Sequence, residues 1–482
     1  MTFIGSLDQG TTSTRFIIVN HEGEIIAQNQ LEHQQILPHS GWVEHDADEI
    51  WRNTLQVITG AISDANISPS QLAAIGITNQ RETTVCWSKS TGEALANAIV
   101  WQDTRTADFL NNLSDSQKAI IQEKTGTPIA PYFSASKMTW LLNNKVAASE
   151  DLAFGTIDSW LLFKLTGEFA TDVTNASRTQ LMNLKTLDWD DQLLEIFGIK
   201  REWLPAIKPS LHLFGTTKDG VAITGILGDQ QAAMFGQVCF EEGESKTTYG
   251  TGNFSLISTG SKIVKSKHGL ITTVLHQIEN EPAQYALEGS VAVTGSAVQW
   301  LRDQLGIIQS SDEIEPLAAS VPDNGGVYFV PAFSGLFAPY WRSDARGVIV
   351  GLTRANTKAH IARATLEAIC YQTKEVIDAM QADSGIKLKE LRVDGGITRN
   401  KLCMQLQADI LAIDVVKPII TETTALGAAF AAGLKIGFWQ SKDELKKIWK
   451  REQTWHSQSS IEWRSSGYEN WRKAITRTYD LA

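Results

Sequence analysis

One local pattern recurs near the start of both halves of the chain: a short apolar run, a turn rich in glycine and threonine, and a second apolar run. In the first half, Phe3–Leu7 and Arg15–Val19 flank the turn Asp8-Gln-Gly-Thr-Thr-Ser-Thr14, and a third run, Glu24–Gln28, follows closely. Runs of this length that are bounded by turn residues predict strands. Because only short turns separate the runs, we expect the three strands to form an antiparallel meander.

The second copy of the pattern begins close to the middle of the 482-residue chain. Here Lys246–Tyr249 and Phe254–Ser258 flank the turn Gly250-Thr-Gly252. A chain of this length is long enough for two large domains, each with its own core. No linker rich in proline, serine or glycine separates the halves, so we expect two domains, residues 1–250 and 251–482, packed against each other.

Helical patterns alternate with the strands in both halves, which indicates an α/β fold. In the first half, Asp46 is suited to cap a helix with Glu49 in its first turn, and Ala73–Thr78 follows as a buried strand. In the second half, the strand Leu391–Val393 ends in Asp394-Gly-Gly396 and leads into another helix. The apolar positions on which these two helices are predicted are Trp51, Leu55, Ile58 and Ile62, and Leu402, Leu406 and Ile410.

Composition and charge exclude several classes of protein. Asp and Glu outnumber Lys and Arg by 54 to 43, and a net charge of −11 argues against a nucleic-acid partner, whose phosphate backbone is also negative. No apolar run reaches the ~18 residues of a transmembrane helix, and the first residues lack the basic and apolar regions of a signal peptide. The 4 cysteines are scattered and form no CxxC pair, which suits a reducing compartment. We therefore expect a cytoplasmic protein without membrane insertion.

The first turn has the components of a phosphate and metal site. Backbone N–H groups and hydroxyls of Gly10, Thr11, Thr12 and Ser13 can converge on an anion, and Arg15 adds a positive charge. A carboxylate at the end of the preceding strand, Asp8, is suited to a hydrated Mg²⁺. The pattern alone fits an ordinary hairpin with a polar tip equally well.

Two further glycine turns extend the phosphate interpretation. Gly250-Thr-Gly252 follows a predicted strand, and Gly395-Gly396 lies at a strand-to-helix junction, where glycine allows a ligand to approach the backbone. Three such turns at distant positions suggest a nucleotide in a cleft between two domains. The chain contains no GxxxxGK[ST] motif, no GxGxxG in a first βαβ unit and no HRD…DFG set, which excludes a P-loop enzyme and a protein kinase and argues against a dinucleotide-binding fold.

Two charged motifs carry candidate chemistry. Asp229 follows an apolar run and a glycine, where a carboxylate can act as a general base towards an alcohol; a helix N-cap is the simpler explanation. Arg81 and Glu82 follow the strand Ala73–Thr78 and could offer donors and an acceptor to a polyol; a surface ion pair is the alternative. Taken alone, each motif favours the structural explanation.

Together these motifs resemble the FGGY carbohydrate kinases. Segments 132–144 and 347–367 match the two signatures of that family, and the resemblance runs from Phe3 to about Gly433. Within the family, the chain is most similar to the members that phosphorylate glycerol. The motifs that single them out are Gln80-Arg-Glu-Thr83, Trp101-Gln-Asp-Thr-Arg105, Gly228-Asp-Gln-Gln231 and Thr248-Tyr-Gly-Thr-Gly252.

The resemblance implies two actin-like, RNase-H-like α/β domains that flank an ATP cleft, and MgATP-dependent phosphorylation of glycerol to sn-glycerol 3-phosphate. It implies Asp229 as catalytic base and Asp8 as the acid that organises Mg²⁺. The implied glycerol contacts are Arg81, Glu82, Tyr132, Asp229 and Gln230, with Trp101 and Phe254 as the apolar wall. The implied nucleotide contacts are Thr11, Thr12, Ser13, Arg15, Thr251, Gly295, Gln299, Gly396 and Asn400.

Other functions within the same fold remain open at this point. A pentulose or erythritol kinase is the nearest alternative, and a non-catalytic sugar sensor is a more distant one, because a shared fold does not fix function. Intact Asp229 and Asp8–Arg15 segments favour an enzyme. We expect a homodimer or homotetramer. The stretch 214–222 lacks the Gly-Gly-Lys loop through which some relatives bind fructose 1,6-bisphosphate, and it contains no histidine for phosphorylation, so we expect neither form of regulation.

Overall fold

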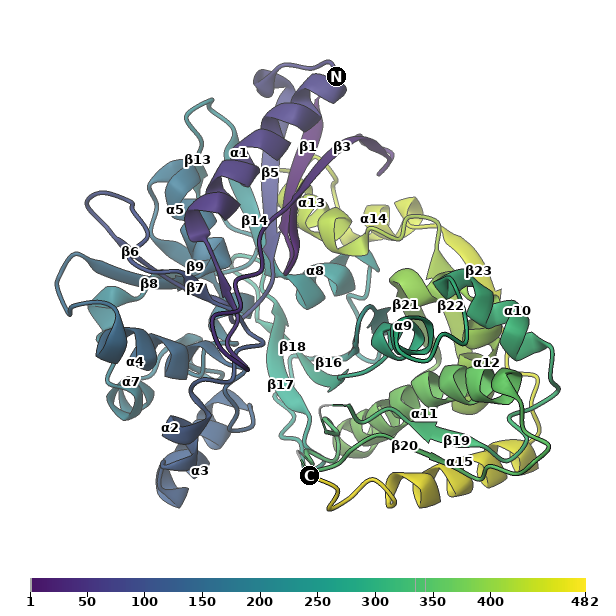
Figure 1. Ribbon diagram of the computed structural model, residues 1–482. Helices are drawn as coiled ribbons and strands as arrows, with labels where there is room; N and C mark the ends of the chain where they lie inside the picture. Colours follow the sequence, from purple (N-terminus) through teal and green to yellow (C-terminus); the bar gives the residue numbers. More distant parts are fainter. Residues whose placement is uncertain (1, 334, 343) are drawn as a thin grey trace.

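Two mixed β-sheets with helices packed around them form the two lobes of the protein in a computed structural model, which describes residues 2–333, 335–342 and 344–482 (Figure 1). The first sheet has the order β13-β14-β5-β1-β2-β3 and the second β17-β18-β16-β15-β21-β22-β23. A smaller sheet, β4-β7-β6-β8, extends the first lobe.

The strands of the first sheet are β1 (Phe3–Gln9), β2 (Ser13–Val19), β3 (Ile25–Glu32), β5 (Leu72–Asn79), β13 (Gly215–Thr216) and β14 (Ala222–Gly228). Those of the second are β15 (Ser245–Tyr249), β16 (Asn253–Gly260), β17 (Ile271–His276), β18 (Gln284–Val291), β21 (Glu390–Asp394), β22 (Asp414–Pro418) and β23 (Arg451–Trp455). Those of the smaller sheet are β4 (Glu44–His45), β6 (Thr84–Ser88), β7 (Ala98–Ile99) and β8 (Leu152–Thr156).

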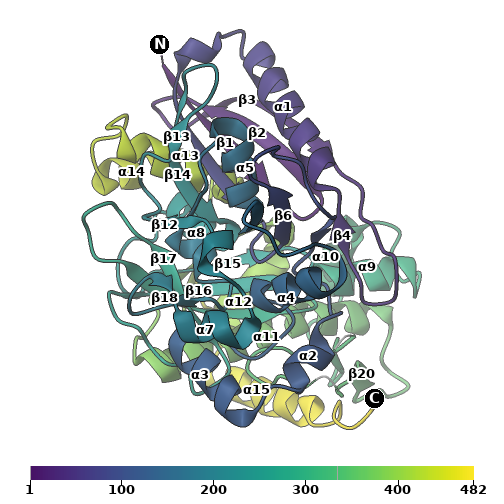
Figure 2. The same cartoon turned by 90° about the vertical axis from the view of Figure 1, so that its left-hand side faces the viewer.

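The principal helices are α1 (Ala47–Asp64), α3 (Asp115–Thr125), α4 (Ser134–Asn144), α5 (Ile157–Thr166), α6 (Val173–Ala176), α7 (Asp191–Phe197), α8 (Asp229–Gly236), α9 (Gly295–Asp303), α10 (Ile314–Ala319), α11 (Lys358–Ser384), α12 (Lys401–Leu411), α13 (Thr423–Lys435), α14 (Lys442–Ile448) and α15 (Ile461–Ile475). Figure 2 shows α1 along one side of the first lobe, beside β2 and β3. Figure 1 shows the yellow helix α15 running along the second lobe next to α11. Among the described residues, no helix combines the length and apolar character needed to cross a bilayer.

The local pattern that recurs in the two halves belongs to a larger duplication, which the topology of the two sheets shows. Along the order β3-β2-β1-β5-β14, the first two pairs of neighbouring strands are antiparallel and the last two pairs are parallel. Strands β18-β16-β15-β21-β22 repeat the same senses in the same order. The two glycine and threonine turns therefore occupy equivalent positions, between the first two strands of each unit. The expected meander at the start of the chain is also present.

The predicted first helix exists, but the face on which it was predicted is not its buried face. Asp46 caps α1 by accepting a hydrogen bond from the backbone of Asp48. The fully buried positions are Ala47, Ile50, Thr54, Val57 and Ala61. Leu55 is 46% exposed. Small side chains at 47, 54 and 61 let the helix backbone lie close to the sheet, with Ile50 and Val57 buried between them, while Trp51, Ile58 and Ile62 pack partly buried at the margins.

The two halves of the chain interlock. Helix α13, from the second half, packs on β1, β5 and β14 of the first sheet and crosses α8 (Figure 1). Glycines make the crossing possible: a Cβ on Gly427 would lie 1.8 Å from the carbonyl oxygen of Ala232, and one on Gly236 would lie 2.0 Å from that of Thr423. In addition, β15 precedes residue 250 but pairs with β16 in the second sheet. The division into 1–250 and 251–482 stays a prediction.

Candidate active site

Asp229 lies where the central strand β14 gives way to α8. It is the first residue of the helix; the N-cap is Gly228, and the Asp229 carboxylate accepts a hydrogen bond from the adjacent backbone N–H of Gln230, at 2.6 Å. The helix-cap alternative is therefore wrong. Oδ1 of Asp229 lies 3.0 Å from Nε of Arg81, and the Asp229 side chain is 31% exposed. The result is a partly exposed carboxylate at a helix N-terminus, held beside a guanidinium.

Arg81 and Glu82 are not a surface ion pair. Both are almost completely buried, with 3% and 1% of their surface exposed. Each has a different partner: Arg81 forms two hydrogen bonds with Glu288, of 2.5 and 2.8 Å, and Glu82 accepts from Nε of Arg178 at 2.5 Å. Burial raises the pKa of Glu82, and the cations of Arg178 and Arg81 partly offset this. Burial alone would also raise the pKa of Glu288, but Arg178 and Arg81 outweigh it and hold that pKa at about 2.

Three aromatic side chains from three separate parts of the chain meet next to these charges. The ring centroid of Trp101 lies 5.4 Å from that of Tyr132 and 6.4 Å from that of Phe254, in edge-to-face arrangements. Phe254 is on β16 of the second sheet, whereas Trp101 follows β7 and Tyr132 precedes α4, both in the first lobe. Both lobes therefore contribute to one site. Six of the seven residues predicted to contact glycerol are linked by ion pairs or ring contacts, in part through Arg178 and Glu288, and the seventh, Gln230, is adjacent to Asp229 in the chain.

The phosphate turn connects β1 to β2 and lies beside the same site. Asp8 and Arg15 are directly opposite each other in the antiparallel register. Nε1 of Trp101 donates to Oγ1 of Thr11 at 3.0 Å, which links the turn to the aromatic wall. Burial raises the pKa of Asp8 to about 6; Arg15 lowers it, while the charges of Asp229 and Glu422 raise it further. Arg15 forms an ion pair with Glu422, which precedes α13.

The remaining predicted nucleotide residues line a single cavity in the second lobe, with a volume of about 510 Å³. Thr251 comes from the β15–β16 turn, Gly295 and Gln299 from α9, and Gly396 and Asn400 from the segment between β21 and α12. The size is typical of small-molecule sites. A Cβ on Gly295 would lie 2.7 Å from the carbonyl oxygen of Gly250, so glycine is needed for the helix to begin this close to the turn.

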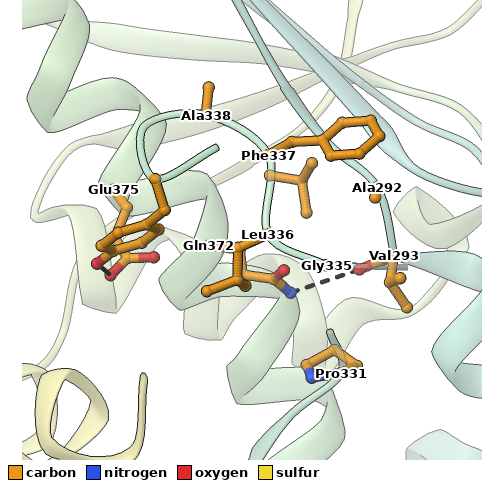
Figure 3. A pocket seen from close by; sticks show the side chains of 11 residues that line it. Ala292, Val293, Pro331, Gly335, Leu336, Phe337, Ala338, Gln372 and Glu375 are labelled. Carbon is orange, nitrogen blue, oxygen red and sulfur yellow. Dashed lines mark hydrogen bonds between the residues drawn. The ribbon is translucent and has the colours of Figure 1, made fainter. Parts of the chain in front are cut away.

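A second cavity, shown in Figure 3, has a volume of only about 10 Å³, roughly that of one water molecule. Gln372 and Glu375 of α11 border it, and Gln372 donates to the carbonyl oxygen of Val293 at 3.4 Å. None of the predicted site residues lines this cavity. We therefore assign it no part in the site.

Sequence reasoning missed four buried charged residues near the site. Arg178 and Glu288 form the ion pairs described above. Lys246 of β15 donates to Oε1 of Gln230 and to Oγ1 of Thr248, and burial lowers its pKa to about 8. Lys137 of α4 donates to the carbonyl oxygens of Pro131, Tyr132 and Phe133, which holds the loop that carries Tyr132. Only Lys137 lies in a recognised signature; nothing in the local sequence marks the other three.

Comparison with known proteins decides the family. The models for the N-terminal and C-terminal domains of the FGGY family of carbohydrate kinases match residues 3–236 and 246–436. The chain belongs to the FGGY family of carbohydrate kinases. This FGGY kinase is 57% identical to a glycerol kinase of Mycobacteroides abscessus and 58% identical to glycerol kinase 1 of Streptomyces coelicolor. Each alignment covers 99% of this chain, and it covers 99% and 98% of the respective relatives.

Solved structures agree with the family and the fold. This FGGY kinase superimposes on the glycerol kinase of Plasmodium falciparum, solved with ADP, with a TM-score of 0.94, 40% sequence identity, and coverage of 99% of this chain and 98% of the other. The xylulose kinase of Lactobacillus acidophilus gives a TM-score of 0.88 at 22% identity, over 99% of this chain and 97% of its own, which shows the fold alone. The expected two-domain α/β fold of the family is confirmed.

Proposed function

We propose that this FGGY kinase transfers the γ-phosphoryl group of ATP to glycerol and forms sn-glycerol 3-phosphate. One observation carries the proposal: the charged cluster of Arg81, Glu82 and Asp229 is connected, through Arg178 and Tyr132, to the aromatic wall of Trp101 and Phe254. A three-carbon triol has little apolar surface, so its recognition depends on oriented hydrogen bonds. The full-length relatives named glycerol kinase support this substrate.

The proposed glycerol contacts divide by chemistry. Arg81 supplies donors, Glu82 supplies an acceptor, and Tyr132 and Gln230 supply further polar groups. Trp101 and Phe254 contact the carbon backbone. The arrangement surrounds the substrate with few donors and acceptors, most of which are already held by protein partners. A sugar with a longer carbon chain would bring further hydroxyls, and few free donors and acceptors remain to pair with them once they are buried.

Asp229 is the proposed general base. Its carboxylate takes the proton from the attacking hydroxyl as the phosphorus–oxygen bond forms and the bond to the ADP oxygen breaks. The neighbouring guanidinium of Arg81 keeps the carboxylate in place, at 3.0 Å. Phosphoryl transfer has a loose transition state, so most of the catalysis comes from positioning and charge stabilisation.

For the nucleotide, we propose that Thr251, Gly295, Gln299, Gly396 and Asn400 hold the nucleoside end, and that Thr11, Thr12, Ser13 and Arg15 bind the phosphates. Asp8 fits a hydrated Mg²⁺: its raised pKa reflects burial near two other carboxylates, and a cation would relieve that repulsion. The ion neutralises phosphate charge when bound.

A polyol panel tests the function. ADP release is measured with MgATP and glycerol, dihydroxyacetone, erythritol or xylulose. We expect the highest kcat/KM with glycerol. A preference for xylulose or erythritol would reassign the substrate within the family, and no ADP release with any acceptor would favour a sugar sensor. We also propose the expected homodimer or homotetramer, and sedimentation of the purified protein tests it.

A further inference from the structure

We propose that Glu288 and Arg178 are positioning residues of the polyol site, which hold Arg81 and Glu82 so that a restricted set of donors and acceptors faces the substrate. The inference rests on the proposed function and deepens it. No motif pointed to either residue. Glu288 also comes from β18 of the second sheet. A residue of the second lobe would therefore orient the substrate-binding side chain of Arg81 in the first lobe.

Glu288 saturates most of the Arg81 guanidinium. Its two carboxylate oxygens accept from Nη1 and Nη2 of Arg81 at 2.5 and 2.8 Å, and Gln231 accepts a further Nη1 hydrogen at 3.2 Å. Nε of Arg81 lies 3.0 Å from Asp229. Arginine has five N–H groups in a fixed plane. One Nη2 hydrogen is therefore left without a partner among the described residues, and Glu288 fixes the direction in which it points.

Arg178 performs the corresponding task for Glu82. Its Nε donates to Oε1 of Glu82 at 2.5 Å, and its Nη2 donates to Glu288 at 3.2 Å. The side chain is completely buried. Oε2 of Glu82 has no hydrogen-bond partner among the residues described, so one acceptor remains available. Arg178 thus links the two carboxylates that would otherwise repel each other.

An unpartnered donor supports a ligand rather than a purely structural role. Nη1 of Arg178 is buried and finds no hydrogen-bond partner in the described part of the chain. The guanidinium carbon lies 5.8 Å from the ring centroid of Tyr132, which is itself a proposed substrate contact. Buried polar groups without a partner are rare and costly. A substrate hydroxyl, or a water that bridges to it, would complete the hydrogen bonding of Arg178.

The backbone supports the same conclusion. Glu82 has a φ of 60°, a left-handed conformation that a residue with a side chain adopts at a cost. Buried ion pairs are also a poor source of stability, because desolvation offsets much of their attraction. An unfavourable backbone, two buried pairs and an unpartnered donor in one place are what a preorganised binding site requires.

The first experiment compares Glu288→Gln with the wild-type enzyme. The amide keeps the shape but loses the charge and one acceptor for Arg81. We expect the KM for glycerol to rise about tenfold or more, the usual weight of a charged hydrogen bond, while the KM for ATP changes less than about twofold. Selectivity for glycerol over 1,3-propanediol, which lacks the central hydroxyl, should fall by a similar factor.

A matched control is Glu367→Gln. Glu367 is also buried and also pairs with an arginine, Arg363, at 2.8 Å, but it lies on α11 and takes no part in the site. The Glu367→Gln variant should leave unchanged both the KM for glycerol and the selectivity for glycerol over 1,3-propanediol. The inference is rejected, and Glu288 is only structural, if Glu288→Gln changes neither the KM for glycerol nor the selectivity. The same holds if it raises the KM values for glycerol and ATP equally.

A second measurement does not depend on whether a variant folds. In a crystal of the wild-type enzyme with glycerol, Nη1 of Arg178 should lie within hydrogen-bond distance of a glycerol oxygen or of a water bound to glycerol. A bound glycerol without either contact overturns the inference. Wild-type enzyme that does not phosphorylate glycerol rejects the proposed function instead, so the two failures are distinguishable.

Discussion

Nε1 of Trp101 donates a 3.0 Å hydrogen bond to Oγ1 of Thr11. The indole belongs to the aromatic wall of the proposed glycerol site, and the hydroxyl belongs to the turn proposed to bind phosphate. The backbone N–H of Trp101 is in turn held by Oγ1 of Thr83 at 3.2 Å, two residues after Arg81. Substrate wall and phosphate turn are therefore parts of one hydrogen-bonded unit.

A double-mutant cycle measures that link. Trp101→Phe keeps an aromatic wall but removes the donor, and Thr11→Val keeps the shape but removes the acceptor. Each should lower kcat/KM about 2- to 13-fold, because a neutral hydrogen bond contributes about 0.5–1.5 kcal/mol. Since both changes delete the same bond, the double variant should be little worse than either single one. Fully additive losses would mean that the bond does not couple the two parts.

Asp229→Asn tests the general base. The amide cannot accept the proton, and we expect kcat to fall by a factor on the order of 10²–10⁴. Binding of ATP, measured by calorimetry, should persist. Asp191→Asn is the control. Asp191 is likewise the first residue of a helix, α7, but it is highly exposed and is not among the proposed site residues. Near-normal turnover in Asp229→Asn would refute the assignment.

The raised pKa of Asp8 predicts a pH-dependent metal requirement. Protons and Mg²⁺ compete for the carboxylate, whose pKa is about 6. At a low, fixed Mg²⁺ concentration, kcat/KM should fall as the pH drops through about 6, and added Mg²⁺ should restore part of it. A pH profile that is the same at all Mg²⁺ concentrations would contradict the proposed role.

The same pKa predicts a gain in stability when the charge is removed. The folded protein binds a proton at Asp8 more tightly than the unfolded chain does, because the pKa rises from 3.8 to about 6. Ionised Asp8 therefore lowers the free energy of unfolding. This loss is complete above about pH 6, partial between pH 3.8 and about 6, and absent below pH 3.8. Asp8→Asn should raise Tm more at pH 7.5 than at pH 5. The control variant Asp219→Asn, at an exposed position, should leave Tm unchanged at both pH values.

Gly228→Ala tests how closely Arg81 is confined. A Cβ at residue 228 would lie 2.7 Å from Cδ and 2.8 Å from Cγ of Arg81, although the backbone, with φ −59°, accepts alanine. Displacing Arg81 should raise the KM for glycerol about tenfold, within the usual 1–3 kcal/mol of overpacking, and leave ATP binding intact. Gly347→Ala, where the nearest atom is 3.4 Å away, is the control. Equal effects of the two variants would argue against confinement of Arg81.

Much of the fold could be predicted from local patterns. Alternation of apolar runs with glycine and threonine turns predicted β1, β2, β3, β5, β15, β16 and β21, because strand ends and tight turns depend on nearby residues. The strands extend one or two residues beyond the predicted runs at several ends, since polar residues such as Asp8 and Ser13 still pair in the ladder. The duplication follows from the order and senses of the strands in the two sheets, which local sequence patterns do not determine.

The site divides in the same way. Five predicted nucleotide residues line one cavity. Thr251 and Gly396 lie in glycine turns that can be recognised locally, whereas Gly295, Gln299 and Asn400 were implied only by the resemblance to the family. Glu288 and Arg178 could not be found, since each is an isolated charge whose partners lie 96 to 207 residues away. The buried face of α1 was missed for a related reason: contact with the sheet selects small residues at 54 and 61, which a hydrophobic pattern ignores.

Helix α13 has a consequence for how the protein is made. One face of the first sheet, with Ile4, Ala74 and Leu227, is covered by Ala425, Ala429 and their neighbours. A ribosome finishes those strands about two hundred residues before it reaches the helix that shields them. The nascent chain therefore carries an apolar sheet surface through nearly half of its translation, and a truncated product that stops before α13 is left with that surface open to other chains.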